Sequence, residues 1–381
     1  MLILGIVVGL LVLSFLVALH ELGHALAAHH SGVKVEEYAI GFPPSLWTKK
    51  LKSGVEIKLN ALPIGGYVKL QGEYDAANNL GDYGRAGYLG KTKILFAGVV
   101  VNFLTAWLIL SILGITGMPI ALPNQFRFKD DKLITSAVQV ADLEEGGPAD
   151  LVGLRRGDEI LTFANVSIDV PEKFADLTTE KAGQTVPILI RRAGEEQTLQ
   201  IKVRGADKPD DKGFVGIYPA QQSWVRTKWY KAPAFGLATT VQFSWETLRG
   251  VGQLFVSFFG GIIQKISLNP AVRQQGSENL AKAGDSVAGP IALLGLIFPS
   301  LIGSDMTTFW FFVALISLTL SVMNLLPIPG LDGGRWMTMT IFRLARQKLT
   351  KEREEKIQTV GVTILLGIMI LVVISDVFKI I

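Results

Sequence analysis

The sequence predicts a polytopic α-helical membrane protein with about four transmembrane helices, a membrane-associated β-hairpin region and one inserted α+β domain. Three observations lead to this fold class. Hydrophobic residues make up 49% of the 381 residues and gather in long, nearly uncharged runs, as membrane spans do. Alternating apolar residues with turn glycines indicate β-structure between these runs. A polar stretch in the middle of the chain has the length of a small soluble domain.

Four strongly apolar runs are long enough to cross a bilayer. The first lacks the basic start and small-residue cleavage site of a signal peptide, so we expect it to remain as a span. The last carries Asp376 near its end. The four predicted spans cover residues 2–28, 94–116, 307–328 and 357–379.

Basic residues between the runs predict the orientation of the chain. Residues 30–93 contain nine Lys and Arg, and residues 335–356 contain seven. Basic loops stay in the cytoplasm, so both segments are expected there, and residues 118–306 and both termini are expected outside. These flanking charges account for the net charge of +4, and no nucleic-acid partner is expected.

Two further apolar stretches are expected to be interfacial or re-entrant. Residues 251–263 are too few to cross a bilayer, and residues 286–303 are interrupted by Pro290 and Pro299. If exactly one of these two stretches crossed the bilayer, the third span would run in the opposite direction, and its C-terminal end would lie at the opposite face of the membrane. The predicted parts of the chain are residues 1–117 with a cytoplasmic hairpin loop at 30–93, a soluble domain at 118–225, an amphipathic region at 226–305, and the last two spans at 306–381.

The soluble domain has a recognisable order of elements. Gly147-Pro148-Ala149-Asp150 predicts the start of a short helix, and a Gly157-Asp158 turn follows. This order resembles a PDZ domain of bacterial proteases, although Val152 stands where that pattern usually has alanine. The resemblance implies an extracytoplasmic PDZ domain. Strands are expected at residues 138–140, 159–163, 186–191 and 197–203.

Residues 35–72 predict a β-hairpin or loop beside the membrane. Apolar residues alternate at 55–59, and the run from Pro63 to Leu70 contains the glycine pair Gly65 and Gly66. A plain cytoplasmic loop is the alternative.

The first span contains the motif His20-Glu21-Leu22-Gly23-His24. An ionisable group inside a membrane helix costs a few kcal/mol, so such groups are rare there without a function. The spacing of four residues places both imidazoles on one helical face, with Glu21 beside them. This pattern is typical of zinc sites in peptidases, and the chain has no cysteine to offer a thiolate.

A catalytic zinc site needs a third protein ligand. His29 and His30 would lie elsewhere around a continuing helix, so an acidic residue is expected instead. Asp332 is the candidate, because Pro327 and Pro329 break the preceding helix and expose backbone groups that membranes tolerate only beside protein or water. A plain helix-end aspartate remains the alternative.

Three motifs in order carry a resemblance that covers nearly the whole chain. They are His-Glu-Leu-Gly-His, Pro-Ile-Gly-Gly-Tyr-Val-Lys and Asn-x-x-Pro-x-Pro-x-Leu-Asp-Gly, and Ala97-Gly98 with Asn102-Phe103 also matches. The chain resembles the site-2 protease family of intramembrane zinc metalloproteases, in its bacterial RseP-type branch with a single PDZ domain. The resemblance implies Zn²⁺ as cofactor, Glu21 as the catalytic base, and three ligands, namely His20, His24 and Asp332.

The resemblance also implies partners and substrate contacts. Expected substrates are single-span membrane proteins, either anti-sigma factors or remnant signal peptides, first shortened by an upstream site-1-type protease. The expected location is the bacterial cytoplasmic membrane, with the active site near the cytoplasmic face. Asn324 is implied to position the substrate, although interhelical hydrogen bonding is its alternative. The other implied substrate contacts are Gly65, Gly66, Tyr67, Pro327 and Pro329.

Two other classes of function remain open at this point. One is a catalytically inactive membrane scaffold that presents a PDZ domain. The other is a membrane metal-binding or transport protein in which His20 and His24 form a transit site. Zinc stoichiometry and the behaviour of a Glu21→Gln variant separate these classes from a protease.

Overall fold

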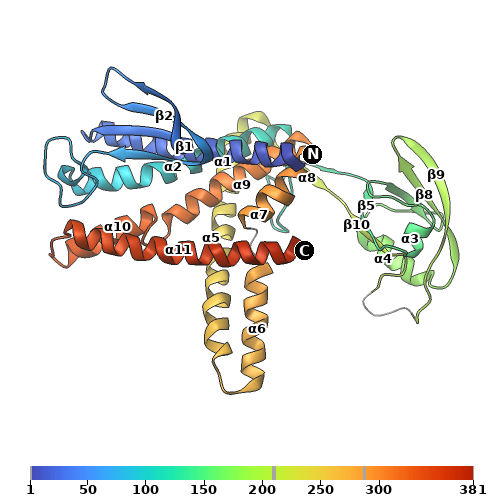
Figure 1. Ribbon diagram of the computed structural model, residues 1–381. Coiled ribbons are helices and arrows are strands. Elements are labelled where there is room, and N and C mark those ends of the chain that lie inside the picture. The colour runs from blue at the N-terminus through green and yellow to red at the C-terminus, as the bar shows by residue number, and fades with distance from the viewer. Residues whose placement is uncertain (1, 208–211, 286–288, 381) are drawn as a thin grey trace. The chain divides into compact units, whose positions relative to one another are not determined.

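The computed structural model describes residues 2–207, 212–285 and 289–380. The chain divides into two compact units, one formed by Met1–Thr116 with Trp229–Ile381 and the other by Gly117–Lys228. The first unit contains the long helices and a β-hairpin, and the second consists mainly of short strands (Figure 1).

Four helices among the described residues are long and apolar enough to cross a membrane, which confirms the predicted number. The third is shorter than the predicted 307–328, because Leu326 is extended. Proline disfavours helical backbone in the residue before it, so Pro327 accounts for this early end. The four helices are α1 (Leu2–His30), α2 (Tyr88–Thr116), α9 (Met306–Leu325) and α11 (Lys351–Ile380).

Helix α2 packs against both α1 and α9. A Cβ atom at Gly23 of α1 would lie 2.6 Å from the Ala97 carbonyl oxygen, so the two helices touch along their backbones. The Ser317 hydroxyl of α9 donates to the Asn102 carbonyl of α2 at 2.9 Å. Small residues and interhelical hydrogen bonds of this kind hold helices together where no hydrophobic effect can.

The hairpin predicted at residues 35–72 is present. Strands β1 (Val35–Lys50) and β2 (Glu56–Leu70) pair antiparallel. Both strands lie beside α1 in Figure 1, and the Tyr38 hydroxyl donates to the Ala18 carbonyl at 2.7 Å. The hairpin is therefore attached to the half of α1 that carries the His-Glu motif.

The predicted interfacial region begins with a helical hairpin. Helix α5 (Ala232–Lys265) and helix α6 (Pro270–Asp285) pack side by side (Figure 1). The apolar residues 251–263 are part of α5 and do not form a separate element. Neither helix is among those long and apolar enough to cross a membrane within the described chain.

The second apolar stretch, 286–303, forms a short helix with a π-helical turn from its fifth residue, and residues 286–288 lie outside the described residues. Helix α7 (Pro290–Ala292) continues as a π-helical turn at Leu293–Ile297 and then as α8 (Phe298–Ile302). Together these thirteen residues span about 20 Å, which is shorter than the hydrocarbon core of a bilayer.

Asp376 near the end of α11 is fully buried and caps the start of this short helix. Its carboxylate accepts hydrogen bonds from the N–H groups of Gly289 and Ala292, both at 3.0 Å. Unpaired N–H groups at a helix start are a favourable site for a carboxylate. The acidic residue in the last apolar run therefore has a structural role, because its carboxyl group binds the start of this helix.

The second unit confirms the four predicted strands and the short helix. Its main sheet has the order β10-β5-β6-β8-β9, with β7 paired to β6, and a smaller sheet has the order β3-β11-β4. The strands are β3 (Met118–Pro119), β4 (Lys132–Thr135), β5 (Val138–Leu143), β6 (Glu159–Phe163), β7 (Val166–Ser167), β8 (Thr185–Arg192), β9 (Glu195–Lys202), β10 (Ile217–Ala220) and β11 (Ser223–Arg226), and the helices are α3 (Pro148–Leu151) and α4 (Pro171–Glu180).

A buried ion pair joins the Gly-Asp turn of this unit to its sheet. Asp158 is 1% exposed and accepts from the Arg192 guanidinium at 2.7 and 2.6 Å, and from the Arg155 N–H at 2.8 Å. Burial by itself raises the pKa of Asp158, but these donors outweigh burial and hold the pKa below its ordinary value.

We expect Asp158→Asn to lower the free energy of unfolding of this unit by about 3 kcal/mol, because Arg192 loses its charged partner. The temperature at which a protease begins to cleave within residues 117–228 of the full chain measures this loss. Because the folded pKa is depressed, the stabilisation is complete above the ordinary Asp pKa of about 3.9 and is lost as the pH falls through the lower folded value. The exposed Asp176→Asn should change little, and an equal loss in both variants would contradict the assignment.

Candidate metal centre

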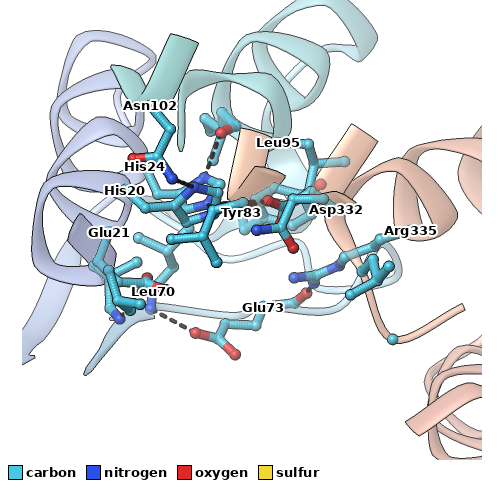
Figure 2. Close-up of a pocket in the computed structure, with 17 residues that line it drawn as sticks. His20, Glu21, His24, Leu70, Glu73, Tyr83, Leu95, Asn102, Asp332 and Arg335 are labelled. Carbon is cyan, nitrogen blue, oxygen red and sulfur yellow. Dashed lines mark hydrogen bonds and ion pairs between the residues drawn. The ribbon is translucent and has the colours of Figure 1, made fainter. Parts of the chain in front are cut away.

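Helix α1 places the two imidazoles of the motif side by side. His20 and His24 lie one turn apart and are only 6% and 7% exposed. Their Nε2 atoms are 3.1 Å apart and face the same cavity (Figure 2). Two nitrogens this close in a buried position need a shared proton or a shared cation between them and their neighbours.

Asp332 follows a short non-helical turn between α9 and the next helix, and this turn places it beside the imidazoles of α1. Asp332 is the first residue of helix α10 (Asp332–Leu344). A Cβ atom at Gly334 would lie 1.9 Å from the Ile328 carbonyl oxygen, so only glycine lets the first turn of α10 fold back on this segment. The Asp-Gly-Gly sequence thus directs the carboxylate toward α1.

The three side chains form a triangle of possible ligand atoms. Asp332 Oδ2 lies 3.1 Å from His20 Nε2 and 3.3 Å from His24 Nε2. Tetrahedral zinc with bonds of about 2.1 Å separates its ligand atoms by about 3.4 Å, so a small expansion of this triangle accommodates the ion. Two imidazoles and one carboxylate are a known donor set of catalytic zinc. The residues fit the metal predicted from the sequence.

His30 takes no part in this triangle, as predicted. Its Nδ1 atom bonds to the Leu26 carbonyl of its own helix at 2.7 Å, and its side chain is exposed. The cluster of possible metal ligands found among the described residues contains only the two histidines of the motif and Asp332.

Gly98 of α2 leaves the space beside the ligand atoms open. A Cβ atom at this position would lie 2.6 Å from His24 Nε2 and 2.7 Å from His20 Nε2. Any side chain here would occupy the place of the cation or push the imidazoles aside. The sequence match at Ala97-Gly98 therefore has a physical reason.

Neighbouring groups on α2 orient the imidazoles. His24 Nδ1 donates to the Ile94 carbonyl at 2.7 Å, which leaves its Nε2 lone pair for a metal. His20 Nδ1 lies 3.4 Å from the Asn102 amide nitrogen, and Asn102 Oδ1 is buried without a partner in the described part of the chain. With the amide rotated by 180°, Oδ1 accepts the Nδ1 proton, and His20 is oriented in the same way.

The charge state of Asp332 follows from its neighbours. Burial by itself raises the pKa of this carboxyl, but hydrogen bonding and charge interactions with His20 and His24 outweigh burial and hold the pKa below its ordinary value. The carboxylate is therefore ionised at neutral pH, which is the form that binds a metal.

A cavity of about 300 Å³ opens beside the triangle. Glu21 lines it, and its Oε2 atom accepts from the Val68 N–H of β2 at 3.0 Å. Asn324 lines the same cavity, where the sequence placed a substrate contact. The other predicted substrate contacts are outside the lining, on β2 at Gly65, Gly66 and Tyr67, and in the turn after α9 at Pro327 and Pro329.

A His-Glu-x-x-His helix with an acidic third ligand, set among helices that can cross a membrane, defines the class of membrane-embedded metallopeptidases. The comparison with known families agrees, since the pattern of peptidase family M50 matches residues 8–368. The chain belongs to this family, the site-2 proteases, and is a zinc-dependent metalloprotease.

Curated relatives resemble the chain along almost its full length. A Campylobacter jejuni protein named "Putative zinc metalloprotease" is 30% identical and covers 97% of this chain and 92% of its own. A Clostridium perfringens protein of the same name is 28% identical and covers 98% of both chains. The "Membrane metalloprotease ARASP, chloroplastic" of Arabidopsis thaliana is 26% identical, over 96% of this chain and 77% of its own.

We expect Gly98→Ala to reduce zinc occupancy and activity severely, because the added methyl group overlaps both ligand nitrogens. The matched control is Gly90→Ala in the same helix, where the nearest atom to an added Cβ is 3.6 Å away. Metal content per chain, measured by mass spectrometry, checks both. Full zinc occupancy in Gly98→Ala would show that the space is not needed.

Proposed function

We propose that the chain hydrolyses peptide bonds within or near the transmembrane segments of single-span membrane proteins. Intramembrane proteolysis is the function of its family. The observation that carries the proposal is a buried cluster of His20, His24 and Asp332 that opens into a cavity shared with Glu21, inside a bundle of apolar helices.

The catalytic roles follow from the chemistry of these side chains. His20, His24 and Asp332 would hold zinc, which supplies a Lewis acid for the scissile carbonyl and makes water more acidic. Glu21 takes the proton of the attacking water and later passes it to the leaving amine. The Asn324 amide faces the same cavity and would donate to the carbonyl oxygen as it gains negative charge.

Substrate presentation must overcome the helical structure of a membrane segment, because a helix satisfies its own carbonyl groups. We infer that the substrate unwinds locally and lies against β2, whose residues Gly65, Gly66 and Tyr67 continue the edge that begins at the cavity. Pro327 and Pro329 would contact the same extended segment from the turn after α9.

The proposed setting is the bacterial cytoplasmic membrane, with the zinc site near the cytoplasmic face. The His-Glu motif lies late in α1 and Asp332 follows the end of α9, so both meet on one side if the two helices run in the same direction. The basic residues that flank these ends favour the cytoplasmic side.

Residues 118–225 are proposed to be an extracytoplasmic PDZ domain that limits access by size. The order of strands and the short helix after Gly147 support this, as does the amphipathic α5 that follows the domain. Proposed substrates are anti-sigma factors or remnant signal peptides that an upstream protease has already shortened.

We expect Glu21→Gln to retain zinc and to lose cleavage of a single-span model substrate by at least 100-fold, since general-base catalysis typically contributes this much. Asp332→Ala should lose zinc as well, because two imidazoles alone bind it weakly. Purified protein in detergent is assayed for cleavage and metal content. His30→Ala is the matched control, since this exposed histidine lies outside the cluster.

The outcomes separate the proposed function from its alternatives. A scaffold would show no cleavage by the wild type and would not depend on zinc. A metal transporter would bind zinc and keep its transport after loss of Glu21. An active Glu21→Gln enzyme would remove Glu21 as the base, and stoichiometric zinc in Asp332→Ala would remove Asp332 as a ligand.

Deletion of residues 125–220 tests the size limit. We expect the shortened chain to cleave full-length substrates that the wild type rejects, because the obstructing domain is gone. Cleavage of paired long and shortened substrates in membranes measures this. An unchanged preference for shortened substrates would argue against a gating role.

A further inference from the structure

The edge of β2 that faces the metal ligands carries two backbone donors. Along a strand, successive N–H groups point to opposite edges. The Gln71 N–H donates to the Lys34 carbonyl on the hairpin side at 2.9 Å. The N–H groups of Val68 and Leu70 point the other way, and both residues line the cavity.

Carboxylates of the same chain hold both of these donors. Val68 donates to Glu21 at 3.0 Å, and Leu70 donates to Glu73 Oε1 at 2.7 Å. Figure 2 shows Glu73 turned back toward Leu70 from the segment that follows β2. A carboxylate oxygen on a strand N–H occupies the place that a carbonyl of a paired strand would take.

We propose that Glu73 is a removable cap on the substrate-binding edge of β2 and thereby limits which segments are cleaved. The proposal rests on the function proposed above and adds a residue to it. An extended substrate would pair one of its carbonyls with the Leu70 N–H, and the Glu73 side chain must first leave. A segment that stays helical offers no such carbonyl and does not displace the cap.

The surroundings of Glu73 let its side chain move while its backbone stays in place. The Glu73 carbonyl accepts from the Arg335 guanidinium of α10. Arg335 Nε also donates to Glu354 of α11 at 3.2 Å, and Glu354 accepts from the Asp75 N–H at 2.8 Å. These bonds hold the main chain at Glu73 and just after it, and the Gly84 N–H bond to the Gly72 carbonyl at 3.2 Å holds it just before, all without using the Glu73 carboxylate.

Arg335 also gives the displaced carboxylate a place to go. Both residues line the cavity, and Figure 2 shows the guanidinium beside the main chain of Glu73 while the carboxylate is turned toward Leu70. The guanidinium already interacts electrostatically with Glu73. Release of Leu70 can therefore exchange this hydrogen bond for an interaction with a neighbouring positive charge that also lines the cavity.

The test compares Glu73→Ala with the wild type on a single-span model substrate in detergent. We expect KM to fall by about three- to tenfold with kcat unchanged, because one hydrogen bond to a charged acceptor no longer competes with the substrate. Glu73→Gln should lie between the two, since its neutral amide oxygen still accepts from Leu70. The control is Glu36→Ala, which removes a hairpin carboxylate that pairs with Lys69 outside the cavity.

Hydrogen exchange at Leu70 gives a second measurement that does not require catalysis. Without substrate, the Leu70 amide should exchange about three- to tenfold faster in Glu73→Ala than in the wild type. In a Glu21→Gln background, bound substrate should restore its protection. The proposal would be overturned by an unchanged or higher KM of Glu73→Ala. It would also be overturned if bound substrate did not slow hydrogen exchange of the Leu70 amide.

The two measurements separate this proposal from the proposed function. A wild type that cleaves, together with a Glu73→Ala variant of unchanged KM, contradicts only the role of Glu73. A wild type that does not cleave contradicts the proposed protease, and exchange at Leu70 then decides the role of Glu73 through binding alone. Zinc content reports whether the variant has kept its fold at the site.

Discussion

Two imidazoles and a carboxylate converge among apolar helices, and each lowers the cost of placing the others there. A charged group in such a position costs a few kcal/mol unless it is paired. His20 and His24 come from the first span, and Asp332 comes from the start of α10, which follows the third. The helices must therefore pack so that these distant segments touch, and the glycines at 98 and 334 remove the side chains that would prevent it.

Strand β2 connects Glu21, the proposed catalytic base, to the wall of the cavity. Glu21 belongs to α1, but its carboxylate is held by the backbone of β2 at Val68. The orientation of the Glu21 carboxylate therefore depends on the position of the hairpin as well as on its own helix. A substrate that pairs with this edge of β2 would be aligned with Glu21, because the same strand positions both.

Local patterns were sufficient to predict a large part of this structure. The four spans, the hairpin and the His-Glu spacing follow from hydropathy and periodicity, because each is a property of neighbouring residues. Asp332 could only be suggested on physical grounds, and the motif resemblance strengthened that suggestion. Pro327 was recognised as a helix breaker, but the third span was placed to end at residue 328, because the apolar run continues past Leu325, where α9 ends.

The supporting contacts of the site could not be predicted, since they join residues far apart in sequence. The bond from Val68 to Glu21 and the bond from His24 to the Ile94 carbonyl have no local signature. Asn102 did give a signal in the sequence, because a polar amide inside an apolar run usually has a buried hydrogen-bond partner. Glu73 gave no such signal, since an acidic residue in a polar loop cannot be distinguished by sequence from an ordinary solvated charge.

The distance in sequence between the ligands has a consequence for synthesis of the protein. The two halves of the site are separated by 312 residues, so a growing chain carries the His-Glu motif long before it carries the aspartate. Until the third apolar helix has been inserted and the turn beyond it is complete, the zinc site lacks one ligand. The chain therefore cannot assemble its zinc site while only its first two apolar helices are in the membrane.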